Sequence, residues 1–238
     1  MRKTLFSGIA ACLLATAATA AEQSPSVIWT VGQADRSASE FALAPDRFRD
    51  FLANDFGYED KYFLVGHSVP AADFPYVLPG PADTWGGTWP TSGWRTHQVN
   101  ILFGLKEIPS DGTCTLVVDL LDYAKNFLPL VKVSVNTQDA KFQLDAPGLC
   151  VADQRKPNQM EKIVDTLSIT GNLAKATPRR LEIPIRPGVL KAGGNEVTIT
   201  VLEGSWILFD RVSLEGPAGT NVEQPQQLFI RNIEAAPY

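Results

Sequence analysis

The stretch LVKVSVN, residues 130–136, alternates apolar and polar side chains. In an extended chain Val131, Val133 and Val135 point to one side, and the lysine, serine and asparagine between them and after them point to the other. This alternation is typical of a strand in an antiparallel sheet that packs one face on the core and exposes the other to water. The stretch therefore predicts a sheet with one wet face.

Seven further stretches are short, rich in β-branched residues and bounded by Gly, Pro, Asn or Asp, which is typical of strands. They cover residues 26–31, 62–66, 97–105, 113–121, 179–185, 195–202 and 205–215. Helical spacing of apolar residues is confined to 45–56 and, more weakly, 159–167. We therefore expect an all-β fold, an antiparallel two-sheet β-sandwich of the jelly-roll, galactose-binding-like type, with one or two short helices. Trp29 and Trp206 alternate with apolar neighbours, and we expect both in the core.

Residues 1–20 have the pattern of a secretory signal peptide, with Arg2 and Lys3 before an apolar run and small residues at 18–20. We expect cleavage before Ala21, a secreted or periplasmic protein, one sandwich domain over 21–216, and an edge strand or tail over 217–238. The net charge of −5 argues against nucleic acid and an anionic membrane surface as partners.

Two cysteines, Cys114 and Cys150, remain after the predicted cleavage. An even pair in an oxidising compartment predicts a single disulfide. A metal site built on two thiols is the alternative, but structural zinc requires four ligands and the sequence contains no CxxC.

Three of the five tryptophans, Trp85, Trp89 and Trp94, lie in PADTWGGTWPTSGWR, residues 81–95. The many glycines and prolines around them predict a surface loop. An exposed indole can stack on the apolar face of a sugar ring, and Asp83, Arg95 and His97 are near enough in sequence to supply hydrogen bonds. The alternative is that the indoles plug the open end of the core. This alternative is favoured for Trp85, whereas ligand contact and core packing are equally supported for Trp89 and Trp94.

A calcium site is a further hypothesis. Asp35 and Glu40 supply oxygens within DRSASEF (35–41), and Asp210 would meet them if the first and last strands pair. The favoured alternative is that Arg36 or Arg211 pairs with Glu40 or Asp210, while Asp35 makes turn bonds to its own backbone.

Catalysis by the chain is also considered. β-Elimination from a uronate requires a base and a cation that neutralises the carboxylate. Lys61, Tyr62, His67, Arg95 and His97 include these residue types, and the carboxylates between 55 and 83 could supply a glycosidase pair. No HExxH, GxSxG or GxGxxG motif is present.

Three stretches taken together resemble a known family. They are IWTVGQADRSASEF (28–41), FPYVLPGPADTWGG (74–87) and VLKAGGNEVTITVLEGSWILFDRVSLEG (189–216). The chain is similar over about 26–216 to the carbohydrate-binding-like β-sandwich, domain III, of rhamnogalacturonan lyases, polysaccharide lyase family 4, and to related modules of bacterial polysaccharide-degrading enzymes. In that family the sandwich accompanies a catalytic domain, which is not found here. The resemblance therefore implies a fold and a substrate class, but no catalytic residues.

Three functions follow as expectations. The first is a secreted carbohydrate-binding protein that recognises an acidic, pectin-like polysaccharide through the Trp-rich loop. The second is a small secreted polysaccharide lyase or glycosidase. The third is a non-catalytic assembly module that docks a partner carbohydrate-active enzyme.

Overall fold

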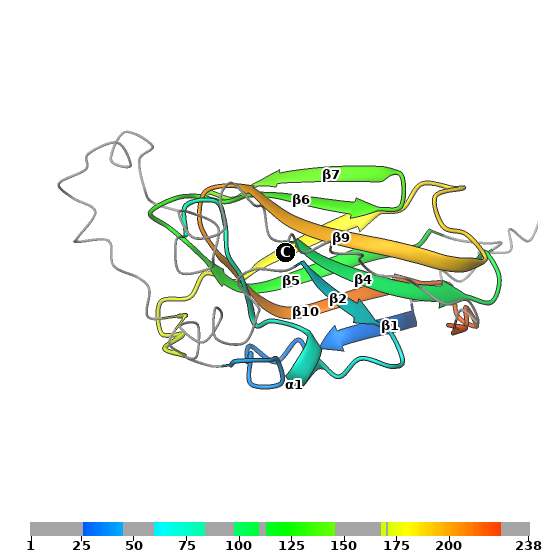
Figure 1. Cartoon of the computed structure of the whole chain (residues 1–238). Coiled ribbons are helices and arrows are strands. Elements are labelled where there is room, and N and C mark those ends of the chain that lie inside the picture. Colours follow the sequence, from blue (N-terminus) through cyan, green and yellow to red (C-terminus); the bar gives the residue numbers. More distant parts are fainter. Residues whose placement is uncertain are drawn as a thin grey trace, which may run out of the picture.

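The computed structural model describes residues 26–44, 60–83, 98–109, 113–145, 168–169 and 171–224. Strands dominate these residues (Figure 1), as the alternating stretches predict. In chain order the elements are β1 (Ser26–Gly32), β2 (Lys61–Leu64), α1 (Pro70–Asp73), β3 (Val77–Leu78), β4 (Gln98–Leu105), β5 (Thr115–Tyr123), β6 (Leu130–Val135), β7 (Gln138–Gln143), β8 (Arg179–Pro184), β9 (Gly193–Glu203) and β10 (Ile207–Gly216).

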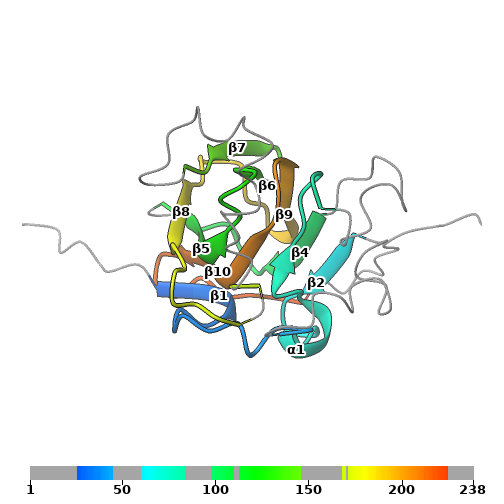
Figure 2. The same cartoon turned by 90° about the vertical axis from the view of Figure 1, so that its left-hand side faces the viewer.

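The strands form two sheets that face each other across the core (Figure 2). The first has the order β1-β10-β5-β8, with β3 also paired to β10, and the second has the order β2-β4-β9-β6-β7. Most neighbours are antiparallel, and the first and last strands pair, from Ser26 opposite Gly216 to Gly32 opposite Arg211. The predicted all-β two-sheet sandwich is therefore confirmed.

Some elements differ from the sequence prediction. β2 pairs with β4 in parallel, not antiparallel, with Lys61 opposite Val99. The polar edge strand β7, the two-residue strand β3 and the single-turn helix α1 are not predicted. The expected helices at 45–56 and 159–167, and the signal peptide at 1–20, lie outside the described residues.

The core is built from the inward-facing residues of both sheets. Trp29 and Trp206 are each only 4% exposed, which confirms their predicted core positions. The Trp29 ring, on the first sheet, packs against Phe103 of the second with 5.2 Å between centroids. Phe74, which precedes β3, contacts both Phe63 of β2 and Phe209 of β10. Aromatic side chains thus join the two sheets.

Beyond β10, the chain turns back to the second sheet. Val222 forms an isolated antiparallel bridge with Leu105 at the end of β4. Hydrogen bonds from Glu223 to Gly104 and from Gln224 to Val65 also hold the described part of the expected tail at the second sheet, and 225–238 lie outside the described residues. No helix among the described residues is long and apolar enough to cross a bilayer.

At one end of the sandwich the side chain of Gln138 links the two sheets. Gln138 begins β7 of the second sheet and is buried. Its Nε2 donates to the carbonyl of Pro184, the last residue of β8, at 2.8 Å, and its Oε1 accepts from the backbone N–H of Arg186 at 2.9 Å. These bonds satisfy backbone groups that β8 leaves unpaired where it ends.

Replacing Gln138 by alanine should lower the free energy of unfolding by about 2 kcal/mol, because it removes the hydrogen bonds of a buried side chain to two backbone groups at the end of β8. Urea denaturation measures this change. Gln143→Ala, at the exposed end of the same strand, is the matched control and should cost less than about 1 kcal/mol. Equal losses of unfolding free energy in the two variants would show that the Gln138 link between the sheets does not stabilise the fold.

Candidate functional site

Three loops meet at the opposite end of the sandwich, around Ser205 in the turn between β9 and β10. On one side, the backbone N–H of Ser205 donates to the carbonyl of Phe127 at 2.9 Å. On the other, the N–H of Ala82 donates to the carbonyl of Gly204 at 3.0 Å. We call the segments 80–83, 124–128 and 204–206 the Ser205 junction. Figure 1 shows the β9–β10 turn at the left-hand end of the sandwich.

Glycine is required where these backbones touch. Gly204 has φ +82°, and a Cβ there would lie 2.3 Å from the carbonyl oxygen of Leu128. A Cβ on Gly80 would lie 2.5 Å from the carbonyl oxygen of Gly204. No side chain fits at such distances, so the turn is clamped between its two neighbouring loops.

Asp83, predicted to bind ligand, forms part of this junction. Its side chain is 6% exposed. Oδ2 accepts from the backbone N–H of Gly80 at 2.9 Å, and Oδ1 accepts from the hydroxyl of Ser205. The carboxylate therefore fixes the residues that lead into the Trp-rich loop, and in this structure it does not project from the surface.

Trp85, Trp89, Trp94, Arg95 and His97 lie outside the described residues. The described residues on either side of the segment 84–97 are held by hydrogen bonds. It begins after Asp83 in the junction and ends before Gln98, which pairs with Thr200, four residues from Gly204. The loop therefore starts and finishes at the junction end of the sandwich.

A pocket of about 180 Å³ lies beside the first loop of the chain. It is lined by Arg36, Ser37, Ala38, Ser39, Tyr76, Leu121, Ser168, Gly171, Leu173 and Leu208. Leucine side chains and the Tyr76 ring form an apolar surface, and hydroxyl groups and the Arg36 side chain provide polar groups. This combination is typical of small-ligand sites, although the volume is below the usual range of about 300–1,000 Å³.

Arg36 is exposed and forms no ion pair with any described residue. Its φ of 65° is unusual for a residue other than glycine. The conformation is held by its backbone N–H, which donates to Oδ1 of Asp210 at 3.0 Å. The sequence gives no direct signal for this contact, because the two residues are 174 positions apart.

Asp35, Glu40 and Asp210 do come to the same end of the paired strands β1 and β10, as expected. Asp35 Oδ1 accepts from the N–H of Ser37, which is the predicted turn bond, and Glu40 Oε1 accepts from the N–H of Gln33. Among the described residues, however, no three acidic, histidine or cysteine side chains are placed to hold a metal ion. The expected calcium site is not formed by these residues in this structure.

The alternative ion pairs also differ from prediction. Arg211 pairs with Asp119 of β5 at 2.9 Å and lies 3.5 Å from Glu215, and not with Glu40 or Asp210. Asp119 is shared with Arg180 of β8. Asp210 is left as a buried carboxyl whose pKa is raised to about 6, mainly by burial, with a further contribution from the charges of Asp35, Asp119 and Glu40.

Three of the residues considered for a lyase, Lys61, Tyr62 and His67, are described by the structure. Lys61 and Tyr62 are neighbours on β2 and therefore point to opposite faces of the sheet. His67 is exposed in the turn that follows. Arg95 and His97 lie outside the described residues. Within the described chain, Lys61 and Tyr62 cannot act on the same substrate atom.

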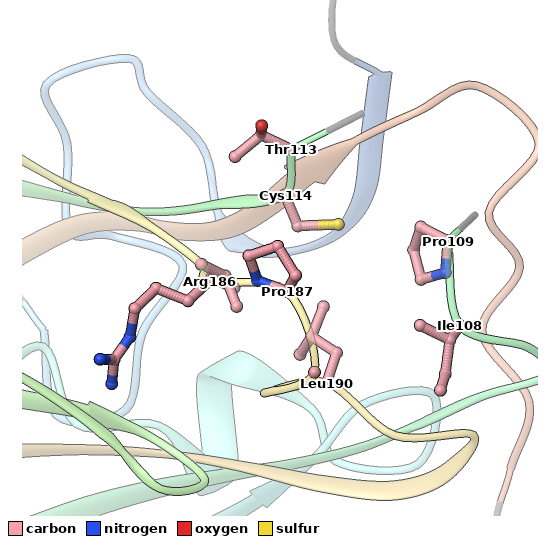
Figure 3. A pocket seen from close by; sticks show the side chains of 9 residues that line it. Ile108, Pro109, Thr113, Cys114, Arg186, Pro187 and Leu190 are labelled. Carbon is pink, nitrogen blue, oxygen red and sulfur yellow. The ribbon is translucent and has the colours of Figure 1, made fainter. Parts of the chain in front are cut away.

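Cys114 lies at the end of the sandwich opposite the junction. Its thiol is free and buried, and burial raises the thiol pKa. Figure 3 shows the sulfur directed toward Pro109, inside a pocket of about 250 Å³ lined mainly by apolar side chains. Arg186 points away from the sulfur, and its Nε donates to Gln138.

The predicted partner, Cys150, lies outside the described residues. The described chain before it ends at Asp145, whose carbonyl accepts from Tyr123 at the far end of β5 from Cys114. The disulfide stays a prediction.

Comparison with known proteins gives one match that spans most of the chain. A family model described as CBM-like, polysaccharide lyase family 4, domain III, matches residues 27–214, which include all ten strands apart from Ser26 of β1 and Glu215 and Gly216 of β10. No curated protein matches the chain.

Solved structures give partial matches. The chain is similar to a family GH115 4-O-methyl-α-glucuronidase described as specific for decorated arabinogalactans, with 16% identity, TM-score 0.30, and coverage of 50% of this chain and 13% of that one. It is also similar to dimeric latent PorU from Porphyromonas gingivalis, with 10% identity, TM-score 0.28, and coverage of 53% and 10%. A third match is BuGH86wt in complex with neoagarooctaose, with 14% identity, TM-score 0.25, and coverage of 57% and 21%. The chain spans a small part of each of these proteins.

The buried Asp210 predicts a pH dependence of stability. Because its pKa is higher in the folded protein than the ordinary 3.8, the folded state binds this proton more tightly than the unfolded chain does. Its contribution to stability is thus complete below about pH 4 and is lost as the pH rises through about 6. Asp210→Asn keeps an acceptor for Arg36 but removes the charge. The variant should match wild type at about pH 4 and exceed it by up to about 3 kcal/mol at neutral pH.

Urea denaturation across this pH range measures the difference. Asp139→Asn is the control of opposite sign, since hydrogen bonds from Lys132 and Ser134 lower the pKa of that exposed carboxyl. Its variant should lose stability at neutral pH, and the loss should vanish on acidification. A pH-independent difference for Asp210→Asn would contradict the assignment.

Proposed function

The chain belongs to the CBM-like family, polysaccharide lyase family 4 domain III, and from this premise we propose that it binds an acidic, pectin-like polysaccharide outside the cytoplasm. The observation that carries the proposal is the family match over 27–214, because it spans both sheets and the loops of the junction. The signal-peptide pattern of residues 1–20 supports export of the protein.

The Trp-rich loop is the proposed binding element. The described residues on either side of it are held by hydrogen bonds, Asp83 in the junction and Gln98 opposite Thr200 in the second sheet. A large, rigid aromatic ring loses little conformational entropy when it stacks on a sugar. Arg95 in the same loop has the planar guanidinium that binds a uronate carboxylate with two parallel hydrogen bonds.

The pocket of about 180 Å³ that Arg36 helps to line offers a second binding place for sugar hydroxyl and carboxylate groups. Hydroxyl groups of Ser37 and Ser39 lie 2.9 Å apart, and Arg36 carries a charge without a partner among the described residues. An apolar wall next to such groups matches the two-faced chemistry of a pyranose ring. The pocket supports carbohydrate binding and does not by itself identify the sugar.

A binding function is favoured over the two alternatives. A lyase would need a base and a cation at one site. Of the described candidates, Lys61 and Tyr62 point to opposite faces of the sheet, and His67 is exposed in the turn after β2. An assembly module that docks a partner enzyme would use the same surface residues as interface anchors. Incubation with pectic and other acidic polysaccharides separates the three possibilities.

Wild-type mature protein should be retained on an insoluble acidic polysaccharide without generating the ultraviolet absorbance of unsaturated uronates. The double variant Trp89→Ala with Trp94→Ala should lose retention because both stacking surfaces are removed, while its melting temperature should stay within a few degrees of wild type. Retention and thermal melting are measured on the same samples. Val69→Ala, which removes an exposed apolar side chain elsewhere, is the control.

Unfolding of the double variant would show that the indoles belong to the core. Growth of absorbance would replace the binding proposal with a lyase. Absence of retention on every polysaccharide, without absorbance, would favour the docking function and contradict the proposal.

A further inference from the structure

Phe127 stands out among the exposed apolar side chains. In the described part of the chain the large apolar residues with substantial exposure are Val27, Val69, Ile108 and Phe127. Phe127 is the aromatic member of this set, and 45% of its surface is exposed. Single exposed apolar residues are common and need no explanation. Phe127 differs from the other three because its backbone is held in the Ser205 junction.

The loop that carries Phe127 is held at several points. At its start, the N–H of Ala124 donates to the carbonyl of Trp206 at 3.0 Å. At its centre, the carbonyl of Phe127 accepts from Ser205, and at its end the carbonyl of Pro129 accepts from Leu144 at 3.0 Å. Leu128 packs against the core. The backbone therefore fixes where the Phe127 ring emerges, and ordering it on binding costs little entropy.

The charged side chain near Phe127 in sequence, Lys125, interacts with groups at the end of β5. The ammonium group of Lys125 pairs with Asp122, donates to the carbonyl of Tyr123 and lies 3.5 Å from the centroid of the Tyr123 ring. Lys125 thus ties the start of the loop to the end of β5. Since Phe127 itself has no polar group, any contact that it makes is through the face or edge of its ring.

The Ser205 turn connects Phe127 to the start of the Trp-rich loop. One residue, Ser205, donates its backbone N–H to Phe127 and its hydroxyl to Asp83, and Trp85 follows Asp83 by two positions. Phe127 and the entry to the Trp-rich loop are therefore held on either side of the same turn. Phe127 and Asp83 therefore lie at the same end of the sandwich, on described residues that contact the same turn.

We propose that Phe127 is a further sugar-binding residue, an aromatic platform that stacks on the apolar C–H face of one pyranose ring of the polysaccharide. This inference rests on the proposed function, because it names an additional contact for the same ligand. The contact adds affinity for the ring without reading its charge, so its contribution is the same at low and high salt, unlike that of the loop arginine.

The test compares three substitutions at one position. Phe127→Ala removes the ring, Phe127→Leu keeps apolar bulk but lacks a flat face, and Phe127→Trp keeps a flat face. Affinity electrophoresis in gels containing a soluble pectic polysaccharide should show about tenfold weaker binding for the alanine and leucine variants and near-normal binding for the tryptophan variant. The ratio to wild type should not change when salt is raised. Ile108→Ala, equally exposed but at the other end of the sandwich, should bind like wild type.

Melting temperatures of all four variants check that the fold is kept, and the tryptophan variant keeps the test informative if alanine destabilises the loop. Binding of the alanine and leucine variants at wild-type strength would overturn the role of Phe127 while leaving the proposed function intact. Loss of binding for leucine and tryptophan alike would also overturn it, since a flat ring would not be what matters. Failure of the wild-type protein to bind would instead remove the proposed function on which the inference rests.

Discussion

The pairing of β10 with strands on both of its sides is the constraint on which the rest of the structure depends. β10 lies between β1 and β5 and also pairs at its start with β3. Because β1 and β10 are the first and last strands, this pairing closes the sandwich and brings Arg36 to Asp210. The same strand begins directly after the Ser205 turn, so its position also fixes the junction. Packing of Phe209 and Trp206 into the core anchors this beginning.

The junction explains how a regular sandwich can present an irregular binding surface. The two sheets supply a rigid frame, and the glycines at 80 and 204 allow three loop backbones to touch where a Cβ would clash. The side chains of Asp83 and Ser205 are buried and hydrogen-bond to each other. Asp83, which the sequence pattern predicts to meet ligand directly, instead uses its carboxylate to fix the described residues 80–83.

Much of the fold can be predicted from local sequence pattern, because alternating β-branched residues leave few other ways to bury one face. The strand prediction at 130–136 matches β6, and the buried positions of Trp29 and Trp206 follow from the same alternation. β7 was missed because QDAKFQ is an edge strand with polar residues and little apolar signal. The parallel direction of β2 could not be predicted, since it depends on which distant strand it meets. The ion-pair partner of Arg211 could not be predicted for the same reason. It is Asp119, on a strand about 90 residues away in the sequence, and not an acidic residue of the first loop.

The central claim is that the ligand is bound at the junction end of the sandwich, and amide hydrogen exchange of the mature protein with and without a pectic oligosaccharide tests it most directly. The account predicts slower exchange in the bound state for 80–83, 124–128 and 204–206 and for the Trp-rich segment 84–97, because the bound ligand shields their amides from water. Slower exchange confined to the opposite end, at 108–114 and 185–190 around Cys114, would contradict the account.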